Sequence, residues 1–364
     1  MRKLFYGISI LLVSVFLYLF FAPTDVDPIA WQSPPAPSMT GGPYASNHLL
    51  AGIERIAGGV GRGPEAIALD AENRIYTGFD DGRVARFAAD GSGYTLLART
   101  GGRPLGVVLH ADGRIFVCDA NRGLLQISSD GAVKVLADRA EGQAFRFTND
   151  LAIASDGGKV YFTDASAKFG YGYDKEDIVE HRGNGRFLVH DPAAGETKVL
   201  LKGLQFANGV ALGPDDAYVL VNETGAYRIL RYWLKGPAAG TSDVFADNLP
   251  GFPDNITFNG KDRFWVALYA PRTPILDVLS NWPYARKMVM RALAVVPPPV
   301  KAQGFAIAFD ANGKLVANLQ DDGKDAYSPI TSVREGTDGY LYFGSLTADS
   351  LARMKLPLLP AGVH

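Results

Sequence analysis

The sequence predicts an all-β body, a six-bladed β-propeller, that follows an N-terminal transmembrane helix. The main observation behind this fold class is a repeated pattern of two short apolar runs joined by a turn. In the clearest copy, Asn208 opens the first run and Tyr218, ten residues later, opens the second. Apolar residues that alternate with period two on both sides of a turn are typical of a β-hairpin. The pattern therefore predicts a strand, a turn and a second strand.

This hairpin pattern occurs six times. Ten residues separate the starts of the two runs in five copies, and eleven separate them in the copy at Asn149, which carries one extra glycine. The copies start at Glu65, Leu105, Asn149, Asn208, Asp254 and Thr331. Their steps of 40, 44, 59, 46 and 77 residues lie near the repeat length of four-stranded propeller blades, with insertions in the longer ones.

A second observation completes the blades. Five of the six hairpins are followed by another pair of apolar runs, at 83 to 98, 123 to 138, 185 to 203, 228 to 247 and 305 to 319. The sixth is followed only by 352 to 357, whereas the run 53 to 58 precedes the first copy without a partner. We expect this N-terminal run to complete the last blade, because closing the ring removes an exposed sheet edge.

Composition is that of a turn-rich globular protein: 47% hydrophobic and 20% charged residues, a net charge of −2, 41 Gly and 22 Pro. Such a charge balance predicts no nucleic-acid partner. The lone Cys118 excludes an intramolecular disulfide, and its place in an apolar run predicts a small buried side chain rather than a reactive thiol.

Residues 4 to 22 contain no charge, and nineteen residues in a helix span about 28 Å, enough to cross a membrane. Basic residues 2 and 3 precede this segment and acidic residues 25 and 27 follow it. The positive-inside rule then predicts that 1 to 22 form a cytoplasmic tip and a signal anchor, with the propeller across the membrane in a periplasmic, lumenal or extracellular space. A cleaved signal peptide is disfavoured by bulky Phe20 and by Pro23.

Two segments lie outside the blades. Residues 23 to 47 are rich in proline and predict an extended tether between the membrane and the propeller at 48 to 364, although Trp31 could pack this tether on the body. Residues 273 to 297 show apolar spacing typical of helices. They either cap one end of the central channel or pack on its rim.

The residues that start the six copies predict a metal site. Equivalent positions in a propeller are related by rotation about its axis, so these side chains converge at one end of the channel. Glu65, Asn149, Asn208 and Asp254 carry hard oxygen donors, which suit Ca²⁺ better than Zn²⁺. Asn208-Gly209 is also a hairpin-turn signal, but Asp254-Asn255 occupies the same place without glycine.

The sequence resembles the strictosidine synthase-like branch of the six-bladed propeller superfamily that also includes gluconolactonases and paraoxonases, and within it the family of adipocyte plasma membrane-associated protein. The resemblance covers nearly all of the body and the N-terminal anchor. It is carried by GPEAIALD (63 to 70), GRPLGV (102 to 107), FTNDLAI (147 to 153), VYFTDAS (160 to 166), FANGVAL (206 to 212), GFPDNITFN (251 to 259) and LYFGSL (341 to 346).

The resemblance implies calcium ligands at Glu65, Asn149, Asn208 and Asp254, the positions that the repeat also indicates. It implies a further ligand at Asn255, and a second role for Asp254 as general base. A bound Ca²⁺ would polarise the carbonyl of a small ester or lactone.

The sequence departs from the family at two places. Leu105 stands where paraoxonases use histidine, and 326 to 333 lack the carboxylate of strictosidine synthase, which makes a condensing enzyme the least expected function. His181 is the histidine most able to reach the channel. We therefore expect a calcium-dependent hydrolase of esters or lactones, with a non-catalytic binding propeller that keeps a structural calcium as the alternative.

Overall fold

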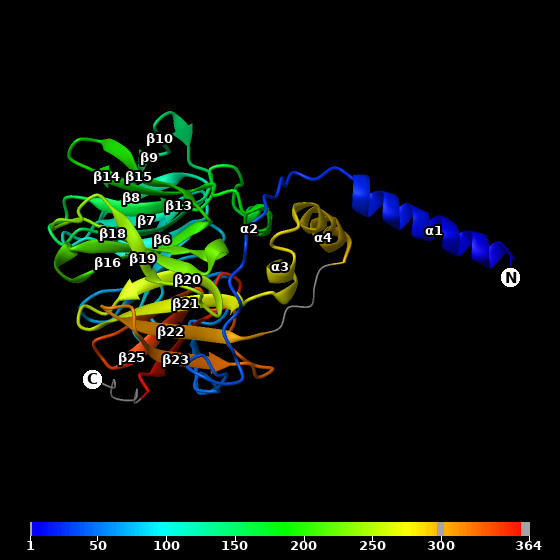
Figure 1. Ribbon diagram of the computed structural model, residues 1–364. Helices are drawn as coiled ribbons and strands as arrows, with labels where there is room; N and C mark the ends of the chain where they lie inside the picture. Colours follow the sequence, from blue (N-terminus) through cyan, green and yellow to red (C-terminus); the bar gives the residue numbers. More distant parts are fainter. Residues whose placement is uncertain (1, 297–301, 358–364) are drawn as a thin grey trace.

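The computed structural model describes residues 2–296 and 302–357, in which six four-stranded antiparallel sheets form the body and a long helix leads into it (Figure 1). The first blade contains β2 (Ala68–Leu69), β3 (Ile75–Gly78), β4 (Arg83–Phe87) and β5 (Thr95–Arg99). The second contains β6 (Pro104–Leu109), β7 (Ile115–Asp119), β8 (Gly123–Ile127) and β9 (Val133–Ala137). The third contains β12 (Thr148–Ile153), β13 (Val160–Asp164), β14 (Gly185–Asp191) and β15 (Glu196–Leu204). A small hairpin of β10 (Arg139–Ala140) and β11 (Gln143–Ala144) joins the second blade to the third.

The remaining blades follow the same order. The fourth blade contains β16 (Ala207–Leu212), β17 (Tyr218–Glu223), β18 (Arg228–Trp233) and β19 (Ser242–Ala246). The fifth contains β20 (Gly251–Phe258), β21 (Arg263–Pro271), β22 (Gly304–Asp310) and β23 (Leu315–Asp321). The sixth contains β24 (Ser332–Glu335), β25 (Tyr340–Gly344) and β26 (Leu351–Lys355). The 3₁₀ turns η1 (Pro214–Asp216) and η2 (Thr224–Ala226) flank β17. Each predicted run is a strand, so the sequence pattern is confirmed.

The ring closes through the N-terminal strand. β1 (Glu54–Ile56) pairs antiparallel with β26 and gives the last blade its fourth strand, as predicted from the unpartnered run 53 to 58. The first and last inner strands also meet, because Ile67 N donates to Ser332 Oγ over 3.3 Å. The chain therefore joins its two ends within one sheet, which leaves no free edge between the first and last blades.

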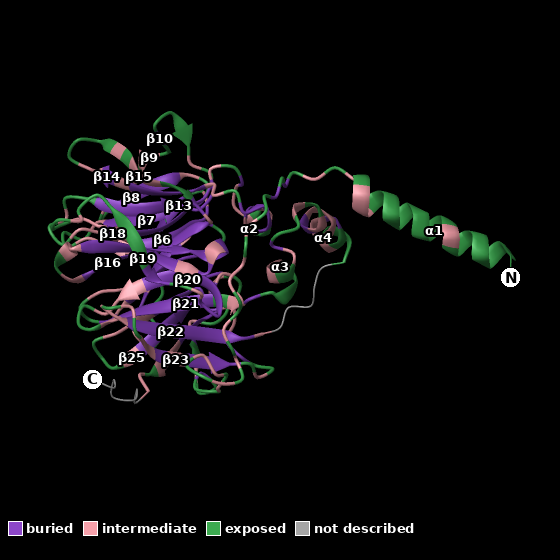
Figure 2. Cartoon of the chain, viewed as in Figure 1, coloured by how far each residue is buried: buried purple, intermediate pink, exposed green. Residues whose placement is uncertain are grey.

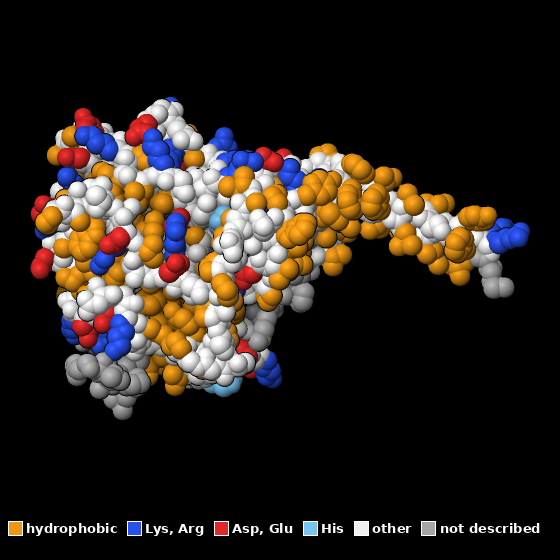
Figure 3. Space-filling view, viewed as in Figure 1, with side chains coloured by type: hydrophobic (Ala, Val, Ile, Leu, Met, Phe, Trp, Pro, Cys, Tyr) orange, Lys and Arg blue, Asp and Glu red, His pale blue; other side chains and the backbone are white. Residues whose placement is uncertain are grey.

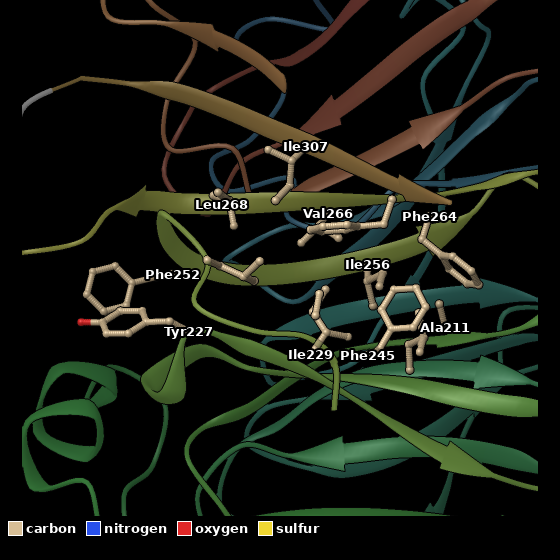
Figure 4. Close-up of a cluster of buried hydrophobic side chains, with 14 of the residues drawn as sticks. Ala211, Tyr227, Ile229, Phe245, Phe252, Ile256, Phe264, Val266, Leu268 and Ile307 are labelled. Atoms are coloured by element: carbon tan, nitrogen blue, oxygen red, sulfur yellow. The ribbon is translucent and has the colours of Figure 1, made fainter. Parts of the chain in front are cut away.

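Apolar side chains from neighbouring blades fill the spaces between sheets, and the strands are buried along most of their length (Figure 2). Between the fourth and fifth blades, aromatic and branched side chains of both sheets interdigitate (Figure 4). Cys118 is fully buried on β7, where its thiol donates to Asp150 O at 3.4 Å, and burial raises its pKa well above the usual value. The prediction of a buried, unreactive thiol is confirmed for its position.

The helix α1 (Arg2–Phe21) is apolar, has no buried residue and is long enough to cross a membrane. It projects away from the propeller, with the N-terminus at its far end (Figure 1). The segment that follows it is not a free spacer. Ile29 N donates to Glu180 O at 3.1 Å, Trp31 N donates to Ser280 O at 3.2 Å, and further contacts continue to Leu50 N on Gln320 O at 3.0 Å. The possibility that the tether packs on the body is thus the one the structure shows.

Trp31 of the tether stacks on His181, with ring centroids 3.9 Å apart and an interplanar angle of 13°. His181 ends helix α2 (Asp174–Glu180) in the left-handed conformation, with φ at 54°. Burial, and then the nearby positive charges of Arg286 and Arg228, lower the pKa of His181 to about 3. The imidazole is therefore neutral in the folded protein at neutral pH.

This neutral histidine makes the fold sensitive to mild acid. Unfolded histidine titrates near 6.5, so below that pH protons bind the unfolded chain preferentially and the free energy of unfolding falls. We expect His181 to contribute a loss of about 2 kcal/mol between pH 7.5 and 5. The variant for comparison is His181→Asn, because asparagine tolerates the left-handed backbone. The melting temperature should fall less between pH 7.5 and pH 5 in this variant than in the parent protein. Equal shifts would contradict the assignment.

Candidate metal centre and cavity

The inner strands carry irregularities at the positions where the sequence predicts site residues. The register of strand pairing changes within four inner strands. It shifts between Thr148 and Leu151 in β12, between Ala207 and Val210 in β16, between Pro253 and Ile256 in β20, and around Leu105-Gly106 in β6. A β-bulge lets two successive side chains leave the regular alternation and is common next to functional sites. The bulges therefore explain how Asn149, Asn208 and Asp254 turn toward the axis.

The glycine after Asn208 is required by close packing at the axis, not by a hairpin turn. Gly209 lies within β16, and a Cβ there would meet Ile256 N at 2.5 Å and Asp254 O at 2.6 Å. A Cβ at Gly106 would likewise meet the Asn149 carbonyl oxygen at 2.9 Å. Neighbouring inner strands thus touch through glycine, which brings the residues beside them together.

A cavity of about 570 Å³ lies at this end of the channel. Glu65, Asn149, Asn208 and Asp254 line it, so four of the predicted metal ligands share one space. Its apolar walls come from the blades and include Leu105, Phe147, Phe206, Phe252 and Leu346. The helices α2, α3 (Pro274–Val278) and α4 (Pro283–Val295) line the remaining side. The insertion at 273 to 297 therefore caps the channel, as far as its described residues reach, while residue 297 lies outside them.

Several oxygens at the bottom of this cavity have no hydrogen-bond donor among the described residues. They are Glu65 Oε2, Asn149 Oδ1 and Asn208 Oδ1, all buried. Asn208 donates its amide N–H to Thr224 Oγ1 at 3.2 Å, which leaves its carbonyl oxygen unpaired. Buried acceptors without donors are costly, and a bound cation would satisfy them.

The charge at the site favours a cation as well. Burial, and then the negative charge of Glu65, raise the pKa of Asp254 well above its usual value. Burial also raises the pKa of Glu65, against the opposing effect of Arg103. Two carboxylates in one buried site therefore repel each other, and a divalent cation would balance their charge.

The donors fit calcium by their chemistry. The four predicted ligands that line the cavity supply two carboxylates and two amide carbonyls, hard oxygen donors that Ca²⁺ accepts together with water. Within residues 2–296 and 302–357, no three His, Cys, Asp or Glu side chains are grouped for metal binding, so a site dominated by histidine or cysteine ligands is not present there. The Asp254 main chain is also held, because Asn222 Nδ2 donates to its carbonyl oxygen at 2.5 Å.

Other predicted residues occupy different places. Asn255 lines a second cavity of about 270 Å³ farther along the inner strands, together with Asp150 and Arg334. Its Nδ2 donates to Glu65 Oε1 at 2.8 Å, whereas its Oδ1 has no donor among the described residues. Thr331 stays off the helix-capped cavity, and its hydroxyl donates to the Glu65 carbonyl at 3.2 Å.

Three other proton acceptors could be considered, and none of them lines the helix-capped cavity. Asp150 faces the second cavity, where Val210 N donates to its carboxylate at 2.9 Å. Glu223 pairs with Arg228 at 2.5 Å. His181, the histidine that the sequence made most able to reach the channel, does not line the cavity and stacks on Trp31. The tether covers this side chain, so it offers no proton acceptor in the cavity.

Sequence analysis missed several polar residues of the cavity, among them Asp174 and Tyr269. Burial raises the pKa of Asp174, which begins α2. Burial, followed by the charges of Asp174 and Asp254, raises the pKa of Tyr269 to about 12, so its hydroxyl stays protonated. An acid at the start of a short helix was the only sequence signal for Asp174, and it has a local explanation in the helix dipole.

Comparisons with solved structures identify the fold. A gluconolactonase from Xanthomonas campestris aligns with a TM-score of 0.60 over 93% of this chain and 99% of that one, at 17% identity. The calcium-binding protein regucalcin from Agrobacterium tumefaciens aligns with a TM-score of 0.57 over 82% of this chain and 92% of that one, at 13% identity. These identities are low, so the likeness establishes the six-bladed β-propeller alone.

Sequence comparisons identify the family. The strictosidine synthase model matches residues 149–237, and the strictosidine synthase-like N-terminal model matches 42–87. Protein STRICTOSIDINE SYNTHASE-LIKE 4 of Arabidopsis thaliana is 34% identical over 99% of this chain and 97% of its own length. Adipocyte plasma membrane-associated protein of Bos taurus is 33% identical over 93% and 86%. The chain therefore belongs to the strictosidine synthase-like family of six-bladed β-propellers.

Proposed function

We propose that this chain is a membrane-anchored, calcium-dependent hydrolase of small esters or lactones. The observation that carries the proposal is the set of unpaired, buried oxygens of Glu65, Asn149 and Asn208, which line a largely apolar cavity together with Asp254. These oxygens share a cavity large enough for a small organic molecule, so an ion held by them would lie beside a bound substrate.

The residues of the cavity divide the chemistry among them. Calcium bound by these oxygens would polarise the substrate carbonyl and favour ionisation of an attacking water. Asn149 and Asn208 offer only neutral carbonyl oxygens, but Asp254 can accept a proton from that water. Phe147 and Phe206 meet edge to face at 5.2 Å on the cavity wall, where they would bind the apolar part of the substrate and exclude solvent.

Two named relatives of the fold support the proposal. One is a gluconolactonase, whose substrate is a lactone, and another is described as a calcium-binding protein. The pairing of these two properties on one fold matches the pairing of an oxygen-rich centre and a cavity in this chain. This support is by analogy of fold.

The test is hydrolysis of a panel of lactones and aryl esters by the full-length protein, with and without a chelator. We expect turnover of at least one class, loss of that turnover in chelator, and recovery on adding calcium. If the chelator leaves turnover unchanged, calcium dependence is refuted. If the calcium-loaded protein turns over no substrate, the binding propeller with a structural calcium becomes the better description.

The anchor is part of the same proposal. We expect α1 to remain uncleaved, with Arg2 and Lys3 on the cytoplasmic side and the propeller on the other side of the membrane. Protease added to the outer face of spheroplasts, or of vesicles of matching orientation, should remove the propeller and leave a short membrane stub. Recovery of a soluble mature protein that begins near Pro23 would contradict the anchor. Protection of the propeller from the protease would indicate the opposite orientation.

A further inference from the structure

The outer face of the cap helices α3 and α4 is the most apolar exposed surface of the body. Outside α1, the described residues contain four large apolar side chains that are more than 60% exposed, and all four lie on these helices or cap α4: Val278 (73%), Trp282 (67%), Val295 (64%) and Val296 (70%). Ile275 and Tyr284 extend the same surface at 50% and 47%. An apolar face of this kind normally marks a contact with a partner or a membrane.

The charges of these two helices point away from that face. Asp277 accepts a hydrogen bond from Ser33 Oγ of the tether at 2.7 Å, and Lys287 pairs with Asp27 of the tether at 3.0 Å. Arg286 is buried and donates to Val179 O at 2.6 Å. The tether and α2 thus bind the polar side of the cap, and the apolar side is left uncovered.

The cap is joined directly to the end of the membrane helix. Arg291 of α4 donates to Leu19 O and Ala22 O, both at 2.7 Å, and to Phe20 O at 3.1 Å. Leu19 and Phe20 belong to the last turn of α1, whose carbonyls have no partner within the helix, and Ala22 directly follows it, so a cation here satisfies and stabilises its C-terminus. Tyr18 and Tyr284 add hydrogen bonds between the same two helices. The apolar surface therefore continues from α1 onto α4 (Figure 3).

We propose that the outer face of α3 and α4 lies in the membrane–water interface, and that the cavity beneath it takes its substrate from the bilayer. The substrate class is then an amphiphilic ester or lactone with a long apolar chain. The first part rests on the placement of α1 in the membrane. The second part rests also on the proposed hydrolase function.

The same two helices form both the interface and the cavity wall. Leu276, Val289, Met290 and Leu293 line the cavity, whereas Val278 and Trp282 do not. Ile275 belongs to both surfaces, because it lines the cavity and is half exposed. A molecule in the outer part of the bilayer would therefore meet the cavity at α3 without crossing water.

A bilayer fits this surface better than a second copy of the chain. The surface is continuous with a helix that itself needs lipid, and it carries Trp282 and Tyr284, residue types that collect at membrane interfaces. A helix with one apolar face and its charges on the other side is also the form in which helices lie on membranes. Contact with a second copy is an outcome that the experiment distinguishes.

The position is tested by spin labelling of the full-length protein in lipid nanodiscs. Cys118 is buried, so a nitroxide can be attached to Val278→Cys alone. The matched control is Val244→Cys, an exposed valine (47%) on β19, the outermost strand of the fourth blade. We expect the label at 278 to be more accessible to oxygen than to a water-soluble nickel complex, and the label at 244 to show the reverse. Equal, aqueous behaviour at both sites would overturn the proposal. So would dipolar coupling between 278 labels of two chains without oxygen accessibility.

The substrate class is tested by kinetics with matched esters, one short and water-soluble and one long-chained and embedded in vesicles. The double variant Val278→Asp and Trp282→Asp should lower kcat/KM for the embedded ester about 10-fold or more, and change that for the soluble ester less than 2-fold. The control Val244→Asp should change neither. Equal loss on both esters, or no loss on either, would overturn delivery from the bilayer. If no ester is hydrolysed, the hydrolase proposal and the substrate class fail together, while the spin labels still decide the position of the cap.

Discussion

Asp254→Asn is expected to reduce hydrolytic turnover by about 10²-fold or more, in the range assigned to general-base catalysis. The substitution keeps the shape of the side chain and one oxygen for calcium, but it removes the proton acceptor and one negative charge. Asp254 and Glu65 are the two members of the set whose carboxylates can both hold the ion and take a proton in the cavity, and the family resemblance implies the base at Asp254. The measurement is kcat at saturating calcium, with metal content determined on the same sample.

Asp150→Asn is the matched control, because it makes the same chemical change in the second cavity. We expect this variant to keep turnover within a few-fold of the parent. If Asp254→Asn retains full kcat with the metal bound, Asp254 is not the base, and the acid to test next is Asp174, which also lines the cavity. If the parent protein shows no turnover at all, Asp254→Asn should only weaken calcium binding, as in a binding propeller.

Calcium is expected to raise the melting temperature by several degrees. An ion that binds the native state alone stabilises it by about 2.7 kcal/mol at a hundredfold excess over Kd. The effect has a structural cause here, since ligands from four blades line one cavity, and the buried oxygens of Glu65, Asn149 and Asn208 that have no donor carry an electrostatic cost without the ion. Melts of the chelator-treated protein, followed by a calcium titration, measure it.

Glu65→Gln should remove most of this response, since it deletes one of the two charges that balance the ion. Glu196→Gln, at an exposed position on β15, provides the control and should respond like the parent. A melt that is the same in chelator and in millimolar calcium, for protein shown by metal analysis to be empty, would exclude the site. If calcium still raises the melting temperature of Glu65→Gln, the ion binds elsewhere in the channel.

The sequence by itself determined the blades, because strand pairing within a blade depends on local periodicity and short turns. The ten-residue spacing from Asn208 to Tyr218 recurs with few changes, so every inner strand and its neighbour were predicted. The unpartnered run before the first copy predicted the closure that β1 and β26 make. Rotational equivalence then brought Glu65 and Asp254 into one prediction, and both line the same cavity.

The tertiary structure alone decided what covers the site and what faces it. Asp174 lies in the cavity because the inserted helix α2 folds over the channel, and Tyr269 lines it from the end of β21. Such contacts leave no periodic signal in the chain. Trp31, a residue of the tether 150 positions earlier, stacks on His181 and covers it. The hydrogen bond from Arg291 to Leu19 O at the end of α1 also connects residues far apart in the sequence. Each depends on packing between distant segments, and local sequence rules describe only neighbours along the chain.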